Sequence, residues 1–175
     1  MLESIPAGYS IQLAKPEHIP LLAEIEAAAG TIFPDGSLPE NVLAERVPYT
    51  VFADACTDGR LLVALDSARS PVGFAFWLDI VGSALLALIE VHPHHGQKRL
   101  GSAMVARVIQ HVTDAGFSSL YLTTFADIPW NQPFYQKSGF VTLDDEKQPA
   151  FITEILREER AKGLSNRVSM RYSLA

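Results

Sequence analysis

The chain has 175 residues, of which 48% are hydrophobic and 19% are charged, and its formal net charge is −6. This size and composition predict one globular domain over residues 1–175 and exclude a disordered protein. The negative balance argues against nucleic acid as a partner, because a phosphate backbone requires a basic face. The sequence shows neither a secretory signal nor a run of roughly 18 apolar residues, so we expect a cytoplasmic protein with no membrane partner.

The first half of the sequence predicts a strand and two helices, followed by three consecutive strands. In chain order these are a strand at 9–14, helices at 15–30 and 38–47, and strands at 61–65, 72–78 and 84–91. Turn residues separate the three apolar runs, which is typical of an antiparallel meander. The last run is almost entirely apolar, so burial on both of its faces is expected.

The second half predicts a parallel crossover. A long helix is expected from Leu100 to Ala115–Gly116, between the strand at 84–91 and another at 119–124. A strand–helix–strand unit of this kind has a right-handed crossover, so these two strands should be parallel. The remaining elements are a helix at 131–137, a strand at 140–143, a helix at 150–161 and a strand at 167–174. The fold class is therefore mixed α/β (α+β), with one central sheet of about six to seven strands flanked by helices.

A glycine-containing loop joins the strand at 84–91 to the long helix. Gly96 and Gly101 allow close backbone approach, and Lys98 and Arg99 add positive charge near the site, although solvated loop charges are also a common reason for such cations. The first N–H groups of a helix are unpaired and carry partial positive charge. The loop is therefore a candidate site for a diphosphate.

Two segments resemble the GNAT acetyltransferases. The first runs from Ile89 to Ala103, with Pro93 and Gly101 at the positions of that family's strand–loop–helix signature. Two residues depart from the signature: Gly96 stands where the family usually has Gln or Arg, and Arg99 stands where it usually has the first Gly. The second runs from Asn131 to Phe140 and is similar to the family element Asn-x-x-(hydrophobic)-Tyr-x-x-x-Gly-Phe. The resemblance implies a GNAT fold whose parallel strands splay around the cofactor, and acetyl-CoA as the acetyl donor, without a metal.

The resemblance also implies which residues contact the cofactor and which perform the reaction. The implied cofactor-binding residues are Val91, Gly96, Gln97, Lys98, Arg99, Leu100, Gly101, Ser102, Asn131 and Phe134. Val91 N–H would contact the acetyl carbonyl, and Asn131 would bind the pantetheine amides or cap its own helix. Tyr135 is the candidate general acid, since a phenol stays protonated at neutral pH, but its ring can also serve packing alone.

The general base is less defined. Glu90 stands in an apolar strand, where burial would raise its pKa into a useful range, or it is a structural carboxylate. His92 is the second candidate, and transfer to an already neutral amine needs no base. The histidines at 92, 94 and 95 lack a carboxylate or cysteine at typical ligand spacing, which argues against a metal site.

The predicted activity is direct acetyl transfer from acetyl-CoA to a primary amine, with a small-molecule acceptor expected from family analogy. The acceptor site is expected between an early group of residues (Glu24, Glu26, Phe33 and Asp35) and a late group (Phe125, Asp127 and Trp130). The alternatives are a catalytically weak acyl-CoA-binding or regulatory module, and acetylation of a protein N-terminus or lysine. The resemblance also suggests a homodimer formed through the strand at 167–174.

Overall fold

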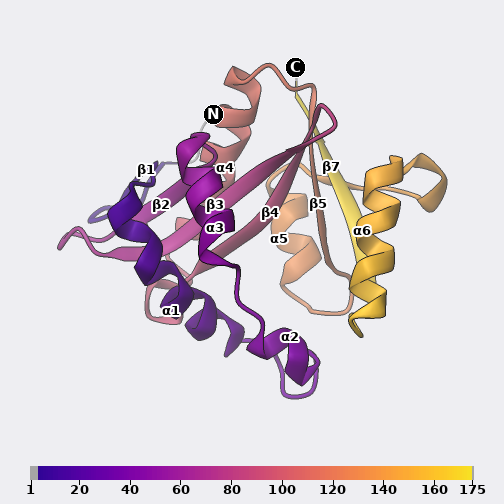
Figure 1. Ribbon diagram of the computed structural model, residues 1–175, viewed down its shortest axis with the longest axis horizontal. Helices are drawn as coiled ribbons and strands as arrows, with labels where there is room; N and C mark the ends of the chain where they lie inside the picture. The colour runs from indigo at the N-terminus through magenta and orange to yellow at the C-terminus, as the bar shows by residue number, and fades with distance from the viewer. Residues whose placement is uncertain (1–3, 175) are drawn as a thin grey trace.

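The computed structural model describes residues 4–174 and contains one seven-stranded mixed sheet with the strand order β1-β2-β3-β4-β5-β7-β6 (Figure 1). The strands are β1 (Ser10–Leu13), β2 (Leu61–Leu65), β3 (Pro71–Ile80), β4 (Ser83–Val91), β5 (Ser119–Phe125), β6 (Val141–Thr142) and β7 (Arg167–Ser173). The α-helices are α1 (Ile19–Gly30), α2 (Glu40–Ala44), α3 (Tyr49–Thr57), α4 (Leu100–Asp114), α5 (Asn131–Lys137) and α6 (Ala150–Ala161). Short 3-10 helices lie at Pro16–His18, Pro93–His95 and Asp145–Lys147. The predicted single mixed sheet with flanking helices is confirmed.

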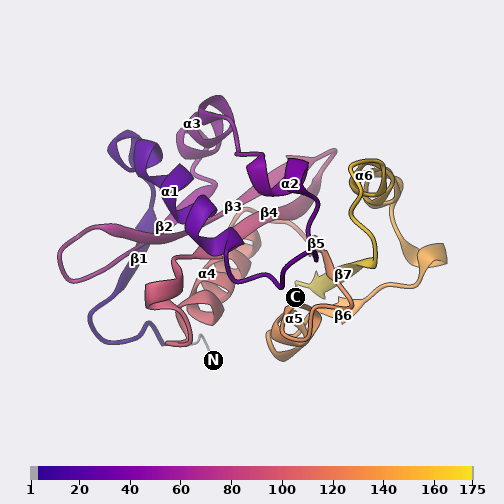
Figure 2. The same cartoon turned by 90° about the horizontal axis from the view of Figure 1, so that it is seen from below.

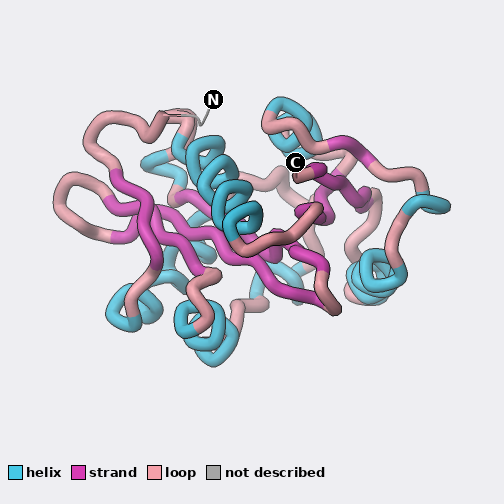
Figure 3. Tube along the Cα trace, turned by 90° about the horizontal axis from the view of Figure 1, so that it is seen from above, coloured by secondary structure: helices cyan, strands magenta, loops and turns pink. Residues whose placement is uncertain are grey.

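Helices cover both faces of the sheet (Figures 2 and 3). One face carries α1, α3 and α6, and the opposite face carries α4 and α5 (Figure 2). The core is divided accordingly into two clusters. Under α4, the buried residues include Leu62, Trp77, Met104, Val108 and Leu122; under α1 and α3, they include Leu22, Ile25, Phe52, Val63 and Phe74. The strand β2 and most of β3 are therefore buried from both sides, whereas β4, for which burial on both faces was predicted, is fully buried only at residues 84–86 and half-buried in the rest of its length.

The region between α1 and β2 differs from the sequence prediction. The helix predicted at 38–47 is limited to α2, and α3 follows it without having been predicted. The chain is extended at Glu45, and Val47 precedes Pro48, whose ring disfavours helical backbone in the residue before it. Pro48 is also the N-cap of α3, which buries Phe52 and Ala55 at i, i+3 spacing against the sheet. Tertiary burial, rather than a strong local pattern, stabilises this helix.

The strands β4 and β5 are parallel and separate soon after they begin. Their register comprises two pairs, Ala84↔Leu120 and Leu85↔Tyr121, whereas β4 continues to Val91 and β5 to Phe125. The predicted splayed parallel pair is confirmed. Beyond Leu85 the β5-facing edge of β4 has main-chain groups that are not used by this ladder, so the divergence exposes backbone donors and acceptors for another molecule.

The last strand lies inside the sheet. β7 pairs with β5 over seven residues and with β6 through Arg171 and Met170. The homodimer suggested for this strand remains a prediction. Among the described residues, no helix is both long and apolar enough to span a membrane.

Candidate active site

A β-bulge in β4 determines the direction of the Glu90 side chain. Trp77 of β3 is opposite Leu86, but its neighbour Phe76 is opposite Leu88, so Ala87 is an extra residue in β4. Leu86 packs under α4, whereas Leu88 packs in the cluster under α1. Side chains alternate between faces along a strand, and Glu90 pairs with Phe74 of the α1-side cluster. Without the bulge, Glu90 would point to the α4 side.

The electrostatic environment of Glu90 favours its neutral form. The pKa of Glu90 is raised from 4.5 to about 8, mainly by burial and also by the nearby Glu26 carboxylate, while Arg46 opposes the shift. Oε2 of Glu90 is buried and has no hydrogen-bond partner among residues 4–174. Burial also raises the pKa of Glu26, although both of its carboxylate oxygens accept the Val47 N–H at 3.2 Å. A group with a pKa near 8 is well matched to taking a proton from an amine at neutral pH.

The backbone at the end of β4 presents a hydrogen-bond donor towards β5. The His92 N–H donates to the Val72 carbonyl of β3 at 2.8 Å. Successive N–H groups of a strand point to opposite edges, so the Val91 N–H points away from β3 and towards β5. Because β4 and β5 have already diverged there, this N–H faces the space between the strands. It can therefore stabilise negative charge on an oxygen bound in that space.

Tyr135 lies on the other side of the sheet. It belongs to α5, contacts the core beneath α4, and makes edge-to-face pairs with Phe134 (5.0 Å between centroids) and Phe140 (5.9 Å). Burial raises the pKa of Tyr135 to about 12, with Glu90 adding to the shift and Arg167 opposing it. The phenol is thus held protonated at neutral pH. The Glu90 carboxylate contributes to this shift, so Tyr135 and Glu90 are near enough to interact electrostatically although they lie on different faces of the sheet.

The start of α4 combines free backbone donors with a left-handed residue. Arg99, the N-cap of α4, has φ 63° and ψ 11°, and within the described chain no side chain caps this helix. This is the conformation a glycine would adopt readily, so the arginine preserves the backbone geometry at a cost of about 1–2 kcal/mol. The first intrahelical bond of the turn runs from Ala103 N–H to Arg99 C=O, which leaves the N–H groups of Leu100, Gly101 and Ser102 available to an anion.

Side chains around this loop hold it against the rest of the molecule. The Tyr9 hydroxyl lies 2.9 Å from His95 Nδ1 and accepts a hydrogen bond from Lys98 Nζ at 3.1 Å. Leu100 is buried in the core, so only its backbone can contact a ligand. A Cβ on Gly101 would lie 3.4 Å from the Phe134 ring, at about van der Waals contact, so Gly101 faces Phe134 of α5.

Further details of the predicted cofactor residues follow from their backbone positions. Gln97 has φ 57°, also left-handed, and Gly96 is the C-cap of the 3-10 helix that precedes it. Asn131 is the first residue of α5, whose N-cap is Trp130, so the alternative that Asn131 caps its own helix is wrong. Its contact with the pantetheine amides stays a prediction.

The structure brings together part of the predicted acceptor region. Phe33 packs against Phe125 and Trp130, with ring centroids 6.0 and 6.3 Å apart. Glu26 accepts a hydrogen bond from the Val47 N–H, and its charge raises the pKa of Glu90. Asp127 is engaged by the Asn166 side chain at 2.9 Å.

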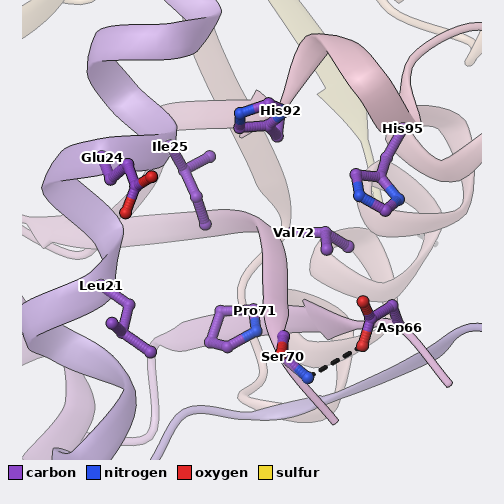
Figure 4. Close-up of a pocket in the computed structure, with 9 residues that line it drawn as sticks. All are labelled: Leu21, Glu24, Ile25, Asp66, Ser70, Pro71, Val72, His92 and His95. Carbon is purple, nitrogen blue, oxygen red and sulfur yellow. Dashed lines mark hydrogen bonds between the residues drawn. The ribbon is translucent and has the colours of Figure 1, made fainter. Parts of the chain in front are cut away.

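Glu24 belongs to a different part of the molecule. With His92 and His95 it lines a cavity of about 300 Å³ beside the β2–β3 turn (Figure 4). Glu24 and Glu26 are 200° apart around an ideal helix, so their carboxylates lie on different flanks of α1. No group of three or more His, Cys, Asp or Glu side chains suited to a metal ion occurs within residues 4–174.

Gly73 is a site residue that the sequence analysis missed. It pairs with Val91, and a Cβ at this position would lie 2.9 Å from the Glu90 carbonyl oxygen and 3.3 Å from the Val91 side chain. The glycine thus allows β3 to approach the reactive end of β4. A glycine within an apolar strand run is the signal for such a close approach.

Sequence and structure comparisons define the family. The family model described as acetyltransferase (GNAT) family matches residues 22–140, which is more than half of the chain. The protein therefore belongs to the GNAT acetyltransferase family, a family of acyltransferases. The resemblance identified from the two motifs is confirmed.

Solved structures share the fold over nearly the whole chain. The PaiA N-acetyltransferase from Thermoplasma acidophilum, in complex with coenzyme A, is 15% identical with a TM-score of 0.72, covering 94% of this chain and 98% of its own. The ribosomal-protein-S18-alanine N-acetyltransferase from Escherichia coli is 17% identical with a TM-score of 0.68, and the coverage is 95% and 94%. N-acetylglutamate synthase from Neisseria gonorrhoeae, complexed with coenzyme A and N-acetyl-glutamate, is 16% identical with a TM-score of 0.71, covering 97% of this chain and 36% of its own.

Proposed function

We propose that the protein transfers the acetyl group of acetyl-CoA directly to a primary amine of a small molecule. The observation that carries this proposal is the placement of Glu90, the Val91 N–H and Tyr135 around the diverging ends of β4 and β5. The start of α4 would hold the diphosphate of acetyl-CoA through backbone N–H groups, and the β5-facing edge of β4 would bind its pantetheine arm.

Each step of the transfer has a group that fits it. Ionised Glu90 accepts a proton from the ammonium form of the acceptor, leaving a neutral amine. The amine nitrogen then forms a bond to the acetyl carbon, and the Val91 N–H stabilises the oxyanion that develops. As the carbon–sulfur bond breaks, Tyr135 protonates the departing thiolate. The second nitrogen proton leaves to solvent, and free coenzyme A and an N-acetylated amine are the products.

Glu90 and Tyr135 lie on opposite faces of the sheet, which supports separate roles for them as general base and general acid. The acceptor would enter on the face covered by α1, where Glu90 points, and the thioester sulfur would lie towards α5 and Tyr135. The pKa of about 8 for Glu90 and about 12 for Tyr135 separates the base from the acid.

The test is release of free thiol from acetyl-CoA in the presence of a panel of primary amines, with acetylated product identified by mass spectrometry. Glu90→Gln should lower kcat/KM at pH 7 by about 10²-fold or more, and Tyr135→Phe should lower kcat by a similar factor. Coenzyme A binding, measured by calorimetry, should be unchanged in both variants. Binding of coenzyme A without acetylation of any amine would instead identify an acyl-CoA-binding module.

A further inference from the structure

Aromatic side chains stand opposite Glu90. Leu85 of β4 pairs with Tyr121 of β5. Phe125 lies four residues after Tyr121, and Glu90 lies five residues after Leu85, one of which is the extra bulge residue Ala87. Once the bulge is discounted, Glu90 and Phe125 are level across the opening between β4 and β5. Phe125 alternates with the core residues Leu120 and Leu122, so it points to the α6 side, which is also the α1 side and the side of Glu90 (Figure 2).

Phe125 is part of an aromatic cluster that includes Phe33 and Trp130. The Phe33 ring makes an edge-to-face contact with Phe125 at 62° and a tilted contact with Trp130 at 50°. Phe125 is 6% exposed, while Trp130 is 43% exposed. The cluster therefore offers accessible aromatic surface on the face where the acceptor would reach Glu90.

The charge next to this cluster is already paired. The Arg167 guanidinium lies 4.3 Å from the centroid of the Phe125 ring, and its Nε and an Nη donate to the two carboxylate oxygens of Glu159 at 3.0 and 2.9 Å. Both side chains of this pair are less than a fifth exposed. Thr123 donates to the same carboxylate at 2.7 Å. An acceptor on this surface therefore meets an aromatic face rather than a free cation that would select a carboxylate.

Residues 31–48, which we call the strap, connect α1 to α3 and reach the turn after α6. Lys162 Nζ lies 2.8 Å from Glu45 Oε1, and the Asn41 amide donates to the Lys162 carbonyl at 3.3 Å. A Cβ on Gly163 would lie 3.2 Å from Pro39. Figures 1 and 2 show α2 beside the end of α6. An extended polypeptide crossing this face would meet the strap.

We propose that the acceptor is a small primary amine carrying a flat aromatic group, with its nitrogen at Glu90 and its ring against Phe33 and Trp130. This rests on the proposed acetyl transfer at the same site. Edge-to-face and offset contacts between aromatic rings contribute beyond the burial of area, and a ring loses little conformational freedom when it binds. The strap restricts the approach of an extended polypeptide across this face, and the aromatic cluster selects among small amines.

Acceptor preference in the wild-type enzyme is the first test. The acceptors are 2-phenylethylamine, n-butylamine, glutamate and a tripeptide with a free alanine N-terminus. The expected kcat/KM for 2-phenylethylamine is at least tenfold higher than for each of the others. An equal or higher value for n-butylamine, glutamate or the tripeptide would overturn the proposed acceptor class while leaving acetyl transfer to amines intact.

Variants locate the effect. Phe33→Ala and Trp130→Ala should each raise KM for 2-phenylethylamine about fivefold, and raise KM for n-butylamine much less, because only the first acceptor has a ring to contact the cluster. The matched control is Phe151→Ala, which removes another edge-to-face pair, with Tyr121 at 5.4 Å, on the same side of the sheet but farther from the ends of the strands. It should leave KM unchanged. An unchanged KM in both Phe33→Ala and Trp130→Ala would remove the aromatic cluster from the acceptor site.

Calorimetry separates the acceptor class from the chemistry. 2-Phenylethylamine is titrated into enzyme saturated with coenzyme A, with n-butylamine as the comparison. Tighter binding of 2-phenylethylamine than of n-butylamine, together with no acetylated product in the assay with acetyl-CoA, would support the acceptor site and refute the proposed transfer. Equal binding of the two amines would refute the acceptor class, whatever the activity.

Discussion

Replacing Glu90 with glutamine removes a carboxyl group whose ionisation the fold opposes. Its folded-state pKa of about 8 lies above the ordinary value of 4.5, so the folded protein holds this proton more tightly than the unfolded chain does. The free energy of unfolding therefore decreases as the pH rises from about 4.5 to about 8. At about 1.4 kcal/mol per pKa unit, the ceiling on this loss is roughly 5 kcal/mol, and solvent relaxation around the partly buried carboxylate should reduce it to roughly 2–4 kcal/mol.

The assay is urea unfolding followed by circular dichroism at pH 5, 6, 7 and 8, with the free energy extrapolated to water. Wild-type stability should decrease over this range, and the decrease should be much smaller in Glu90→Gln. Glu158→Gln serves as the control, because this exposed glutamate on α6 loses the same charge away from the site. Parallel pH profiles for wild type and Glu90→Gln would refute the buried, proton-holding role of Glu90.

Three further substitutions test other parts of the site. Tyr135→Phe should lower kcat by about 10²–10³-fold while leaving KM for acetyl-CoA unchanged, as measured by thiol release; a loss of coenzyme binding instead would make the tyrosine a packing residue. Gly73→Ala places a Cβ 2.9 Å from the Glu90 carbonyl oxygen, so it should lower the free energy of unfolding in urea by about 1–3 kcal/mol and reduce activity. The control is Gly30→Ala, where the nearest atom is 3.8 Å from the new Cβ, and it should change neither stability nor activity. Arg99→Gly should be more stable than Arg99→Ala by about 1 kcal/mol in thermal unfolding, because only glycine removes the left-handed strain; equal stability would show that φ 63° is not imposed in solution.

The sequence was most informative where a local pattern and a buried element coincide. The bounds of α5 and α6 match the predicted 131–137 and 150–161, since amphipathic spacing and turn residues mark both ends. The parallel relation of β4 and β5 followed from the intervening helix, because crossover handedness is a property of the backbone. Arg99 illustrates a limit, because its left-handed backbone depends on how the whole loop is anchored, including the Tyr9–His95 contact 86 residues apart in sequence.

The arrangement of the acceptor side was less accessible from the sequence. Its key features depend on long-range packing: the bulge at Ala87 turns Glu90 to the α1 face, and α1 places Glu26 near it. A bulge has no reliable signature within an apolar run such as residues 84–91. The separation of Glu24 from Glu26 onto different flanks of α1 depends on how the helix is rotated against the sheet. The apolar periodicity of α1 predicts a helix, but it does not determine how that helix is rotated about its axis relative to β4.

The central claim is that Glu90 and Tyr135 serve one acetyl transfer to an amine. The most direct measurement is the pH dependence of kcat/KM, from pH 6 to 9, for wild type and Glu90→Gln with acetyl-CoA and 2-phenylethylamine. We expect a wild-type kcat/KM that rises with pH, with an inflection near pH 8, and a much slower variant that lacks this inflection. A Glu90→Gln enzyme with wild-type activity and an unchanged pH profile would contradict it.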